Sequence, residues 1–394
     1  MPTLKLKPAT CADYRAIAEA RLPRPLFDYL DGGAYDEVTL RRNIEDFATM
    51  KLKQRVMRDV STIETGCRLL DQDWSIPVAL APVGLGGMMA RRGEVQAKRA
   101  ADAMGIPFCL STVAICSLEE VAQVSDKPFW YQLYMLKDRG AVKSLLARAL
   151  DVGVKTLVFT VDLAAVGARY RDVRNGMAGD VGAWGRLRGG AIEYLLHPSW
   201  LFDVGIHGRP HVFGNLAAFA PKGANIGASP GDFRRWAHEQ FDPSVTWKDI
   251  EWLRREWPEK LIIKGVLDPE DAQSAQQVGA DGVIVSNHGG RQLDGVASGI
   301  TMLPRVVDRL KGQKIVILMD GGVRSGQDVI KARALGADGV LVGRPWVYAV
   351  AARGTSGLKS WLNVLRSEIQ VTMALTGMTD LPTPDSNIID EISC

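Results

Sequence analysis

The chain has 394 residues, of which 46% are hydrophobic and 24% charged, and its formal net charge is +3. These values are ordinary for a soluble globular protein, and a net charge this small gives no reason to expect a nucleic-acid partner. The five cysteines are odd in number and lack the spacing of a disulfide framework or a zinc site, so we expect a reducing compartment and no metal. No run of about 18 apolar residues occurs, so we expect no membrane-spanning helix.

The N-terminal part of the chain is predicted to be helical. Residues 12–20 are helix-prone, and residues 26–30 continue an apolar face that Gly32 and Gly33 end. We expect this helical extension to occupy residues 8–70. Tyr29 lies within it, and its residue type suits a place in the core as well as a place in a binding site.

Eight short apolar runs follow, and helix-like segments that carry charges separate most of them. Because each run is apolar throughout, rather than at every second residue, the runs predict parallel strands covered on both faces. Eight such units predict an α/β fold, a (β/α)8 TIM barrel over residues 75–378 within a single domain of residues 1–394; an open doubly wound sheet is the alternative. The predicted strands are residues 76–81, 107–111, 129–136, 156–162, 261–266, 282–288, 315–320 and 339–343. The predicted helices around and after them include residues 93–104, 139–150, 247–257, 269–278, 327–335 and 361–375, with a tail from 382 to 394.

The connection between the fourth and fifth predicted strands is about three times as long as most others. It is an insertion from about residue 173 to residue 242, in which tryptophan, tyrosine and arginine are interleaved with many glycines. So long an irregular loop inside a compact domain is usually functional or disordered. Aromatic and basic side chains suit a membrane interface, so we expect the insertion to anchor the protein peripherally. A lid over the active site, or a contact between subunits, is the alternative.

Polar side chains mark the C-terminal ends of six predicted strands, which is where the active site of such a barrel gathers. Several of them are two residues apart and therefore face the same side of a strand. A single polar residue inside a barrel is often satisfied by packing, but six strands that each contribute one at the same level favour a catalytic site. These residues are Ser111, Thr112, Gln132, Tyr134, Thr160, Asp162, Lys264, Ser286, His288 and Asp320.

His288 is the strongest candidate for a base, because it ends a buried strand and is followed by paired glycines and Arg291. Arg291 is a candidate clamp for an anion, and so is Arg169, seven residues after Asp162. A histidine that only bonds the backbone at a strand end is the alternative. Lys264 is expected to lie against a bound cofactor, or it could form a Schiff base as in barrel aldolases, which would leave His288 and the arginines without a task.

Glycines and arginines follow the last two predicted strands, where barrels commonly bind phosphate. Glycines let backbone N–H groups approach an anion, and arginines donate two hydrogen bonds at once. The chain has neither a P-loop nor the glycine motif of a dinucleotide-binding Rossmann fold. We therefore expect a phosphorylated cofactor on the two turns that contain Asp320, Gly321, Gly322, Arg324, Gly343 and Arg344.

Residues 286–294, Ser-Asn-His-Gly-Gly-Arg-Gln-Leu-Asp, are a highly specific segment that resembles the FMN-dependent family oxidising L-2-hydroxy acids. The resemblance runs from about Tyr14 to Thr376, nearly the whole chain, and implies an FMN cofactor and a homo-tetramer. Within the family, the chain looks most like the bacterial respiratory L-lactate dehydrogenases. The segments that carry this closer likeness are residues 31–35, 81–85, 167–172 and 207–211.

The resemblance also implies a role for each candidate residue. His288 would be the active-site base and Asp162 the carboxylate that orients it, while Lys264 would lie near flavin N1 and the C2 carbonyl. The residues implied for the substrate are Arg169 and Arg291, which would bind its carboxylate, and Tyr29 and Tyr134. The residues implied for the flavin ring and its ribityl phosphate are Pro82, Val83, Gly84, Ser111, Gln132, Thr160, Ser286, Asp320, Gly321, Gly322, Arg324, Gly343 and Arg344.

The function implied by this resemblance is FMN-dependent oxidation of L-lactate to pyruvate, with electrons passed to a quinone or another respiratory acceptor. The protein would act peripherally at the cytoplasmic face of the inner (plasma) membrane. Two positions depart from the family's oxidases: Gly84 stands where they usually have alanine, and Val113 where glycolate oxidase has tryptophan. The alternatives are a dehydrogenase for L-mandelate or a longer L-2-hydroxy acid, an oxygen-using oxidase, a Schiff-base lyase and a non-catalytic binding protein.

Overall fold

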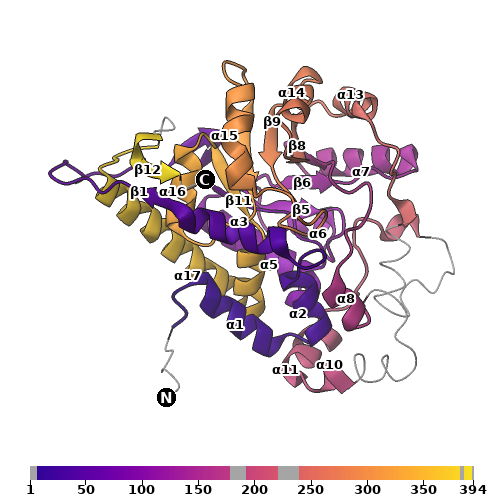
Figure 1. Ribbon diagram of the computed structural model, residues 1–394. Helices are drawn as coiled ribbons and strands as arrows, with labels where there is room; N and C mark the ends of the chain where they lie inside the picture. The colour runs from indigo at the N-terminus through magenta and orange to yellow at the C-terminus, as the bar shows by residue number, and fades with distance from the viewer. Residues whose placement is uncertain (1–6, 178–191, 221–238, 382–385, 393–394) are drawn as a thin grey trace.

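The computed structural model describes residues 7–177, 192–220, 239–381 and 386–392. Eight parallel strands form one sheet in the order β4-β11-β10-β9-β8-β7-β6-β5. A parallel bridge between Leu80 and Phe108 joins the two end strands, so the sheet curls into a barrel (Figure 1). The predicted (β/α)8 barrel is confirmed, and the open doubly wound sheet is excluded. The strands are β4 (Val78–Leu80), β5 (Cys109–Ser111), β6 (Trp130–Leu133), β7 (Thr156–Thr160), β8 (Lys260–Val266), β9 (Gly282–Val285), β10 (Val316–Asp320) and β11 (Gly339–Val342).

Each barrel strand contributes one side chain to a core inside the barrel, and the residues next to it contribute to a second core outside. Both faces of the sheet are therefore apolar, which explains why the sequence shows unbroken apolar runs. The hairpin of β2 (Cys67–Leu69) and β3 (Gln72–Trp74) closes the N-terminal end of the barrel, where the rings of Trp74 and Trp130 lie 5.5 Å apart. The inner residues are Ala79, Cys109, Trp130, Val158, Ile262, Ile284, Leu318 and Leu341.

The connecting helices cover the outside of the barrel (Figure 1). They are α5 (Gly93–Met104), α6 (Leu118–Ala122), α7 (Arg139–Asp151), α13 (Trp247–Glu256), α14 (Pro269–Gln277), α15 (Gly299–Arg309), α16 (Gly326–Ala334) and α17 (Arg344–Thr376). Several begin where their sequence provides a cap. Thr246 and Asp249 form a capping box at the start of α13, and Ser325 and Asp328 form one at the start of α16.

Three helices precede the barrel: α1 (Cys11–Arg21), α2 (Arg24–Asp31) and α3 (Val38–Thr49). Helix α1 packs along α17, and Figure 1 shows the two side by side. Gly32 ends α2, as the sequence predicted. The expectation of helices throughout residues 8–70 is wrong beyond Thr49, because β1 (Met50–Leu52), β2 and the intervening irregular segments occupy the remainder.

The C-terminal part differs from the prediction in two ways. Helix α17 is longer than the predicted helix of residues 361–375, and it contains a break at Arg353 and Gly354, where Gly354 has a φ of 63°. The segment expected to be only a tail contains β12 (Ile389–Ile392), which pairs antiparallel with β1. The pairing joins three- and four-residue strands from opposite ends of the chain, so no local pattern could have indicated it.

The described parts of the insertion contain only short elements. These are α8 (Tyr170–Arg174), α10 (Glu193–Leu195), α11 (Pro198–Trp200), the π-helical turn η2 (Leu201–Ile206) and the 3-10 turn η3 (Ala217–Phe219). Residues 178–191 and 221–238 of the insertion lie outside the described residues. Within the described ranges, no helix is both long enough and apolar enough to cross a bilayer.

Candidate active site

His288 lies in the loop after β9, at the C-terminal mouth of the barrel. Its backbone has a φ of 58°, and its N–H donates to the Ser286 hydroxyl over 3.1 Å. Its Nδ1 lies 2.8 Å from Oδ1 of Asp162, which follows β7. The structure thus brings together the two residues that the sequence predicted to pair. Because the carboxylate holds Nδ1, the ring presents Nε2 as the atom that can accept a proton.

The electrostatics of this pair favour a neutral imidazole beside a carboxylate. Burial lowers the pKa of His288, although the charge of Asp162 acts in the opposite direction. Burial also acts to raise the pKa of Asp162, but the nearby His288 and Lys264 outweigh it and hold that pKa below its usual value. At neutral pH, His288 is therefore unprotonated and available as a base.

Arg169 and Arg291 both lie next to the ring of Tyr29, with guanidinium carbons 5.9 and 4.8 Å from its centroid. Nη1 of Arg291 donates to the carbonyl oxygens of Tyr29 and Gly32. Among the described residues, the only carboxylate that forms an ion pair with Arg169 is that of Asp172, at 4.0 Å. Burial, followed by the charge of Arg291, lowers the pKa of Arg169 to about 10. Two cations held this close form a site for an anion, and a carboxylate matches the guanidinium fork.

Tyr134 follows β6 and lies near the same group of charges. Burial, and then Asp162 and Tyr29, raise the pKa of Tyr134, while Arg169 and Arg291 act in the opposite direction. The net effect is upward, so its hydroxyl stays protonated and can donate a hydrogen bond. The two tyrosines and two arginines predicted to contact the substrate are therefore grouped in one place.

The turn after β4 contains Pro82, Val83 and Gly84. A Cβ atom on Gly84 would lie 2.7 Å from Cγ2 of Val113 and 3.2 Å from the Tyr29 hydroxyl. The turn is therefore packed closely against both side chains. An alanine at this position would have to displace the valine side chain, so Gly84 and Val113, the two positions that depart from the family's oxidases, are in contact here.

Two buried polar atoms on neighbouring strands lack a partner within the described residues: Nε2 of Gln132 and Oγ1 of Thr160. The amide oxygen of Gln132 accepts a hydrogen bond from the Ser111 hydroxyl over 3.1 Å. An unpaired buried polar group costs about 1–3 kcal/mol, so these atoms point to a ligand that bonds them. The carbonyl and ring-nitrogen edge of a flavin offers matching acceptors and donors. Ser111, Gln132 and Thr160 thus fit the FMN that the resemblance implies.

Lys264 belongs to a buried network with Ser286 and Asp320. Its Nζ lies 2.9 Å from the Ser286 hydroxyl and 2.8 Å from Oδ2 of Asp320, and Ser286 donates to Oδ1 of Asp320 over 2.6 Å. Although burial acts to lower it, the charges of Asp320 and Asp162 hold the pKa of Lys264 above its usual value. A lysine that stays charged is a poor nucleophile, which argues against the Schiff-base lyase. It can instead stabilise negative charge on a bound ring.

The sequence predicts a phosphate site on the turns after β10 and β11, where the structure places several backbone groups close together. Gly321 and Gly322 have φ values of 89° and 88°, and a Cβ atom on Gly322 would overlap the carbonyl oxygen of Asn43. Gly343 directly precedes α17, whose first N–H groups have no intrahelical acceptor. Such a helix N-terminus binds anions well, and Arg324 lies in the adjoining loop. These groups fit a phosphate.

The guanidinium of Arg344, which was expected to bind the phosphate, instead donates to three carbonyl oxygens. Its Nε donates to the Leu30 carbonyl oxygen over 3.0 Å, Nη1 to that of Gly289 over 2.9 Å, and Nη2 to that of Gly32 over 2.8 Å. Burial, followed by the charge of Arg291, lowers the pKa of Arg344 to about 9. The side chain therefore connects the loop after β9 to the end of α2. The backbone N–H of Arg344, at the start of α17, is the group of this residue that can bind a phosphate.

The residues that hold the His288 loop in place are not among the site residues predicted from the sequence. Asn287 and Asn43 exchange amide hydrogen bonds of 2.8 and 2.9 Å. Gln292 donates to the loop after β7 over 2.6 Å, and Asp294 accepts from the first turn of α3 over 2.7 Å. Asn287, Gln292 and Asp294 belong to the segment singled out in the sequence, so their polar character was a usable signal. Asn43 lies 244 residues from its partner and gives no such signal.

Comparison with known proteins shows the family to which the chain belongs. Residues 18–391 match the family described as FMN-dependent dehydrogenase. An L-lactate dehydrogenase of Caulobacter sp. (strain K31) is 52% identical over 381 residues, which cover 97% of this chain and 98% of that protein. An L-lactate dehydrogenase of Pseudomonas aeruginosa (strain LESB58) is 52% identical over 365 residues, 93% of each chain. A solved structure described as the monotopic membrane protein (S)-mandelate dehydrogenase matches with a TM-score of 0.88 and 35% identity, over 98% of this chain and 99% of that chain.

Proposed function

Because the chain belongs to the FMN-dependent dehydrogenase family, we propose that it is an enzyme that uses FMN to oxidise L-lactate to pyruvate. The relatives named L-lactate dehydrogenase, 52% identical over almost their full length, support lactate as the substrate. The observation in this chain that carries the proposal is the His288–Asp162 pair near two arginines that share Tyr29. A base and a pair of cations so close together can act on one small hydroxy acid, the base on a proton and the cations on the carboxylate.

The side chains divide the work between orientation and proton transfer. Arg169 and Arg291 bind the substrate carboxylate, which fixes the direction of C2 and its hydroxyl before the reaction begins. Nε2 of His288 removes one proton from the substrate, either from the hydroxyl or from C2. Asp162 keeps the imidazole in the tautomer that accepts at Nε2 and stabilises the imidazolium that forms.

Bound FMN supplies the oxidant that takes the two electrons released as the alcohol becomes a ketone. Lys264, whose ammonium group is held by Asp320 over 2.8 Å, would lie against the ring and would stabilise negative charge on it. The residues proposed to hold the cofactor are Pro82, Val83, Gly84, Ser111, Gln132, Thr160, Lys264, Ser286, Asp320, Gly321, Gly322, Arg324, Gly343 and Arg344.

We further propose that the protein binds a membrane surface through residues 192–206 of its insertion. This segment is fastened to the body of the protein by Trp200, whose indole N–H donates to the Met88 carbonyl oxygen over 2.8 Å, and by an Arg21–Asp203 ion pair of 2.6 Å. Several of its other side chains are apolar and exposed, and so many exposed apolar residues within one short segment suggest an interaction surface. They are Ile192, Leu195, Leu196, Phe202 and Ile206. The similar (S)-mandelate dehydrogenase, described as a monotopic membrane protein, supports the same mode of attachment.

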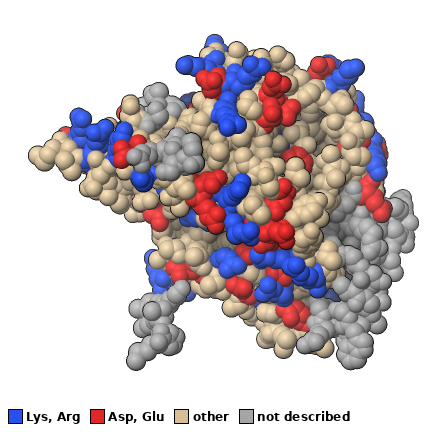
Figure 2. Space-filling model, in the orientation of Figure 1, with Lys and Arg blue, Asp and Glu red and all other residues tan. Residues whose placement is uncertain are grey.

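The electron acceptor is proposed to be a quinone or another respiratory carrier, and the site of action the cytoplasmic face of the inner membrane. The homo-tetramer implied by the resemblance remains a prediction. A nucleic-acid partner finds no support on the face shown in Figure 2, where basic and acidic side chains are interspersed rather than gathered by sign.

The proposal is tested without oxygen. Purified protein is mixed in turn with L-lactate, D-lactate, glycolate and L-mandelate, and the loss of flavin absorbance is followed. We expect L-lactate to bleach the flavin fastest and D-lactate to leave it unchanged. Faster bleaching by L-mandelate would favour the mandelate alternative, and a colourless protein would overturn the cofactor. Oxygen added to the reduced enzyme then separates a dehydrogenase, which reacts slowly, from an oxidase.

A further inference from the structure

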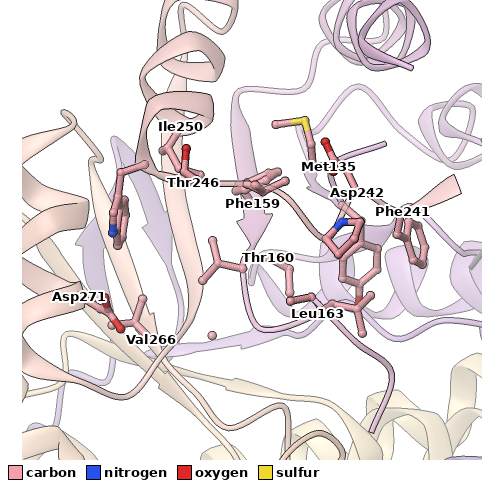
Figure 3. A pocket seen from close by; sticks show the side chains of 17 residues that line it. Met135, Phe159, Thr160, Leu163, Phe241, Asp242, Thr246, Ile250, Val266 and Asp271 are labelled. Carbon is pink, nitrogen blue, oxygen red and sulfur yellow. The ribbon is translucent and has the colours of Figure 1, made fainter. Parts of the chain in front are cut away.

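A cavity of about 390 Å³ lies on the outer side of β7 and β8, between these strands and the segment that leads into α13 (Figure 3). Its lining includes Phe159 and Val266 from the strands, Phe241 from that segment and Trp247, the first residue of α13. Phe159 and Val266 belong to the core outside the barrel, whereas Tyr134 and Thr160, which also line the cavity, lie at its border with the mouth where His288 lies. Tyr134 and Thr160 are the residues of its lining that have a role proposed above.

Tyr134 and Gly265 both line the cavity and lie next to groups of the active site. Tyr134 lines the cavity, where its ring centroid lies 5.0 Å from that of Phe241, while Asp162 and the two arginines act on its hydroxyl. Gly265 also lines the cavity, and a Cβ atom there would come within 2.6 Å of Cγ of Asp162. A ligand in the cavity would thus be one residue away from the groups that bind and deprotonate the substrate.

The walls suit an uncharged, conjugated ring. Phe159, Phe241 and Trp247 offer aromatic surfaces for stacking, and the indole N–H of Trp247 can donate to a carbonyl oxygen. Asp242 also lines the cavity, but Arg139 neutralises its carboxylate over 2.7 Å. The other carboxylate of the lining, Asp271, lies exposed at the rim, so the aromatic walls themselves carry no charge for a small anion or a cation.

The size and the rim of the cavity agree with a small ring compound. A volume of about 390 Å³ is at the lower end of ligand pockets and is enough for one or two rings with a short tail. Ala164, Pro243, Thr246 and Asp271 line the cavity and are exposed, so it opens to solvent. A ligand can therefore enter without a rearrangement of the barrel.

We propose that this cavity binds the ring of a benzoquinone that acts as the electron acceptor. The inference rests on the proposed function: L-lactate loses two electrons and two protons to become pyruvate, and the quinone gains two electrons and two protons to become the quinol. The two reactants need different surroundings. The arginine pair is built for a carboxylate, whereas a neutral quinone requires the aromatic, uncharged walls that the cavity provides.

The test fills the cavity without touching the catalytic residues. Val245 lines it and is half-buried, so Val245→Trp places an indole in the space. Val124, a half-buried valine after α6 that does not line the cavity, gives the matched control Val124→Trp. Binding of a benzoquinone with one isoprenyl unit to each oxidised, FMN-loaded protein is measured by equilibrium dialysis. We expect the Kd to rise at least tenfold in Val245→Trp and less than twofold in Val124→Trp.

Kinetics on the same preparations separate this proposal from the one it rests on. Each protein is first bleached anaerobically by L-lactate, and the reduced enzyme is then reoxidised with the benzoquinone or with ferricyanide, a small dye that can react at an exposed edge. In Val245→Trp we expect bleaching and ferricyanide reoxidation within twofold of the wild type, and reoxidation by the benzoquinone slowed at least tenfold. Absence of bleaching in the wild type would overturn the proposed function, whereas dialysis would still report on the cavity.

Other outcomes decide against the cavity. Wild-type benzoquinone binding by Val245→Trp would overturn the proposal, and so would equal weakening in Val124→Trp. If Val245→Trp loses FMN or unfolds, the smaller Val245→Phe is measured in its place, and an unchanged Kd there overturns the proposal in the same way.

Discussion

The guanidinium of Arg344 lies against the peptide of Gly289, and its Nη1 donates to that carbonyl oxygen over 2.9 Å. Its Nε and Nη2 reach the carbonyl oxygens of Leu30 and Gly32 at the end of α2. One side chain from the start of α17 therefore joins the loop that carries His288 to the helix that carries Tyr29.

Arg344→Lys should loosen this junction. Lysine keeps the charge but cannot present three donors in the fixed fork of arginine. The Gly32 carbonyl oxygen would keep Arg291 as a donor, but those of Leu30 and Gly289 would lose theirs, at a cost of about 1–3 kcal/mol for each carbonyl left unpaired. We expect a loss of about 2–5 kcal/mol in the free energy of unfolding of the FMN-loaded protein, measured by urea denaturation, and slower bleaching by L-lactate. Arg305→Lys, at an exposed position, is the control and should change neither. An unchanged urea midpoint in Arg344→Lys would show that the three bonds do not secure the loop.

His288→Gln tests the base. Glutamine preserves size and polarity but cannot accept a proton at the position of Nε2. We expect the variant to retain FMN and to reduce it more slowly by at least the ~10²–10⁴-fold typical of acid–base catalysis. The measurement is anaerobic stopped-flow bleaching by L-lactate, with exposed His207→Gln as the control. Bleaching at the wild-type rate would remove His288 from the mechanism.

The pH dependence follows from the direction of the His288 shift. Burial lowers its pKa below the ordinary value of 6.5, and the neutral form is the active one. The kcat/KM for L-lactate should therefore be level at neutral pH and fall only as the pH drops through that lowered pKa. Asp162 acts to raise this pKa, so Asp162→Asn should move the acid limb to still lower pH while reducing the plateau, though by less than His288→Gln does. An acid limb that moves to higher pH in Asp162→Asn would contradict this account of the pair.

The barrel could be predicted because each strand repeats one local signal, an unbroken apolar run, and six of the eight runs end in polar residues. The grouping of Thr160, Lys264 and Ser286 followed from topology, since parallel strands end at the same mouth. Contacts between distant segments could not be predicted in this way, as the Asn43–Asn287 amide pair and the pairing of β1 with β12 illustrate. The hydrogen bonds from Arg344 to carbonyl oxygens could not be predicted either. The sequence shows that the residue is a cation, but not that the end of α2 lies beside it.

Arg291→Lys tests the carboxylate clamp. A hydrogen bond to a charged group contributes about 1.5–3 kcal/mol, so loss of the bidentate geometry should weaken lactate binding by about 10–100-fold and slow bleaching as well. The concentration dependence of anaerobic bleaching gives both quantities. Arg169→Lys should act in the same direction, and exposed Arg174→Lys is the control. If both Arg291→Lys and Arg169→Lys bind and reduce like the wild type, the substrate carboxylate lies elsewhere.

The membrane proposal is tested on Leu195, Leu196 and Phe202, whose exposed fractions are 65%, 69% and 64%. Since they are exposed, changing all three to glutamine should leave the fold intact. Burial of each such side chain in a membrane interface is worth about 1.5–3 kcal/mol, so their loss should lower partitioning onto vesicles by more than about 100-fold. Sedimentation with lipid vesicles measures this, and the exposed pair Val56→Gln and Met57→Gln, from another part of the surface, provides the control.

The same preparation decides between an anchor and the two alternatives for the insertion. His288, Asp162 and Arg291 lie outside residues 192–206, so a pure anchor predicts that the triple variant leaves the vesicles yet is bleached by L-lactate at the wild-type rate. Detachment together with slower bleaching would mean that the segment also covers the active site. Continued sedimentation with a changed oligomeric state would instead place these side chains between subunits. The docking of Trp200 and Asp203 on the body of the protein favours the first result, because it holds the apolar side chains in fixed positions before any membrane is met.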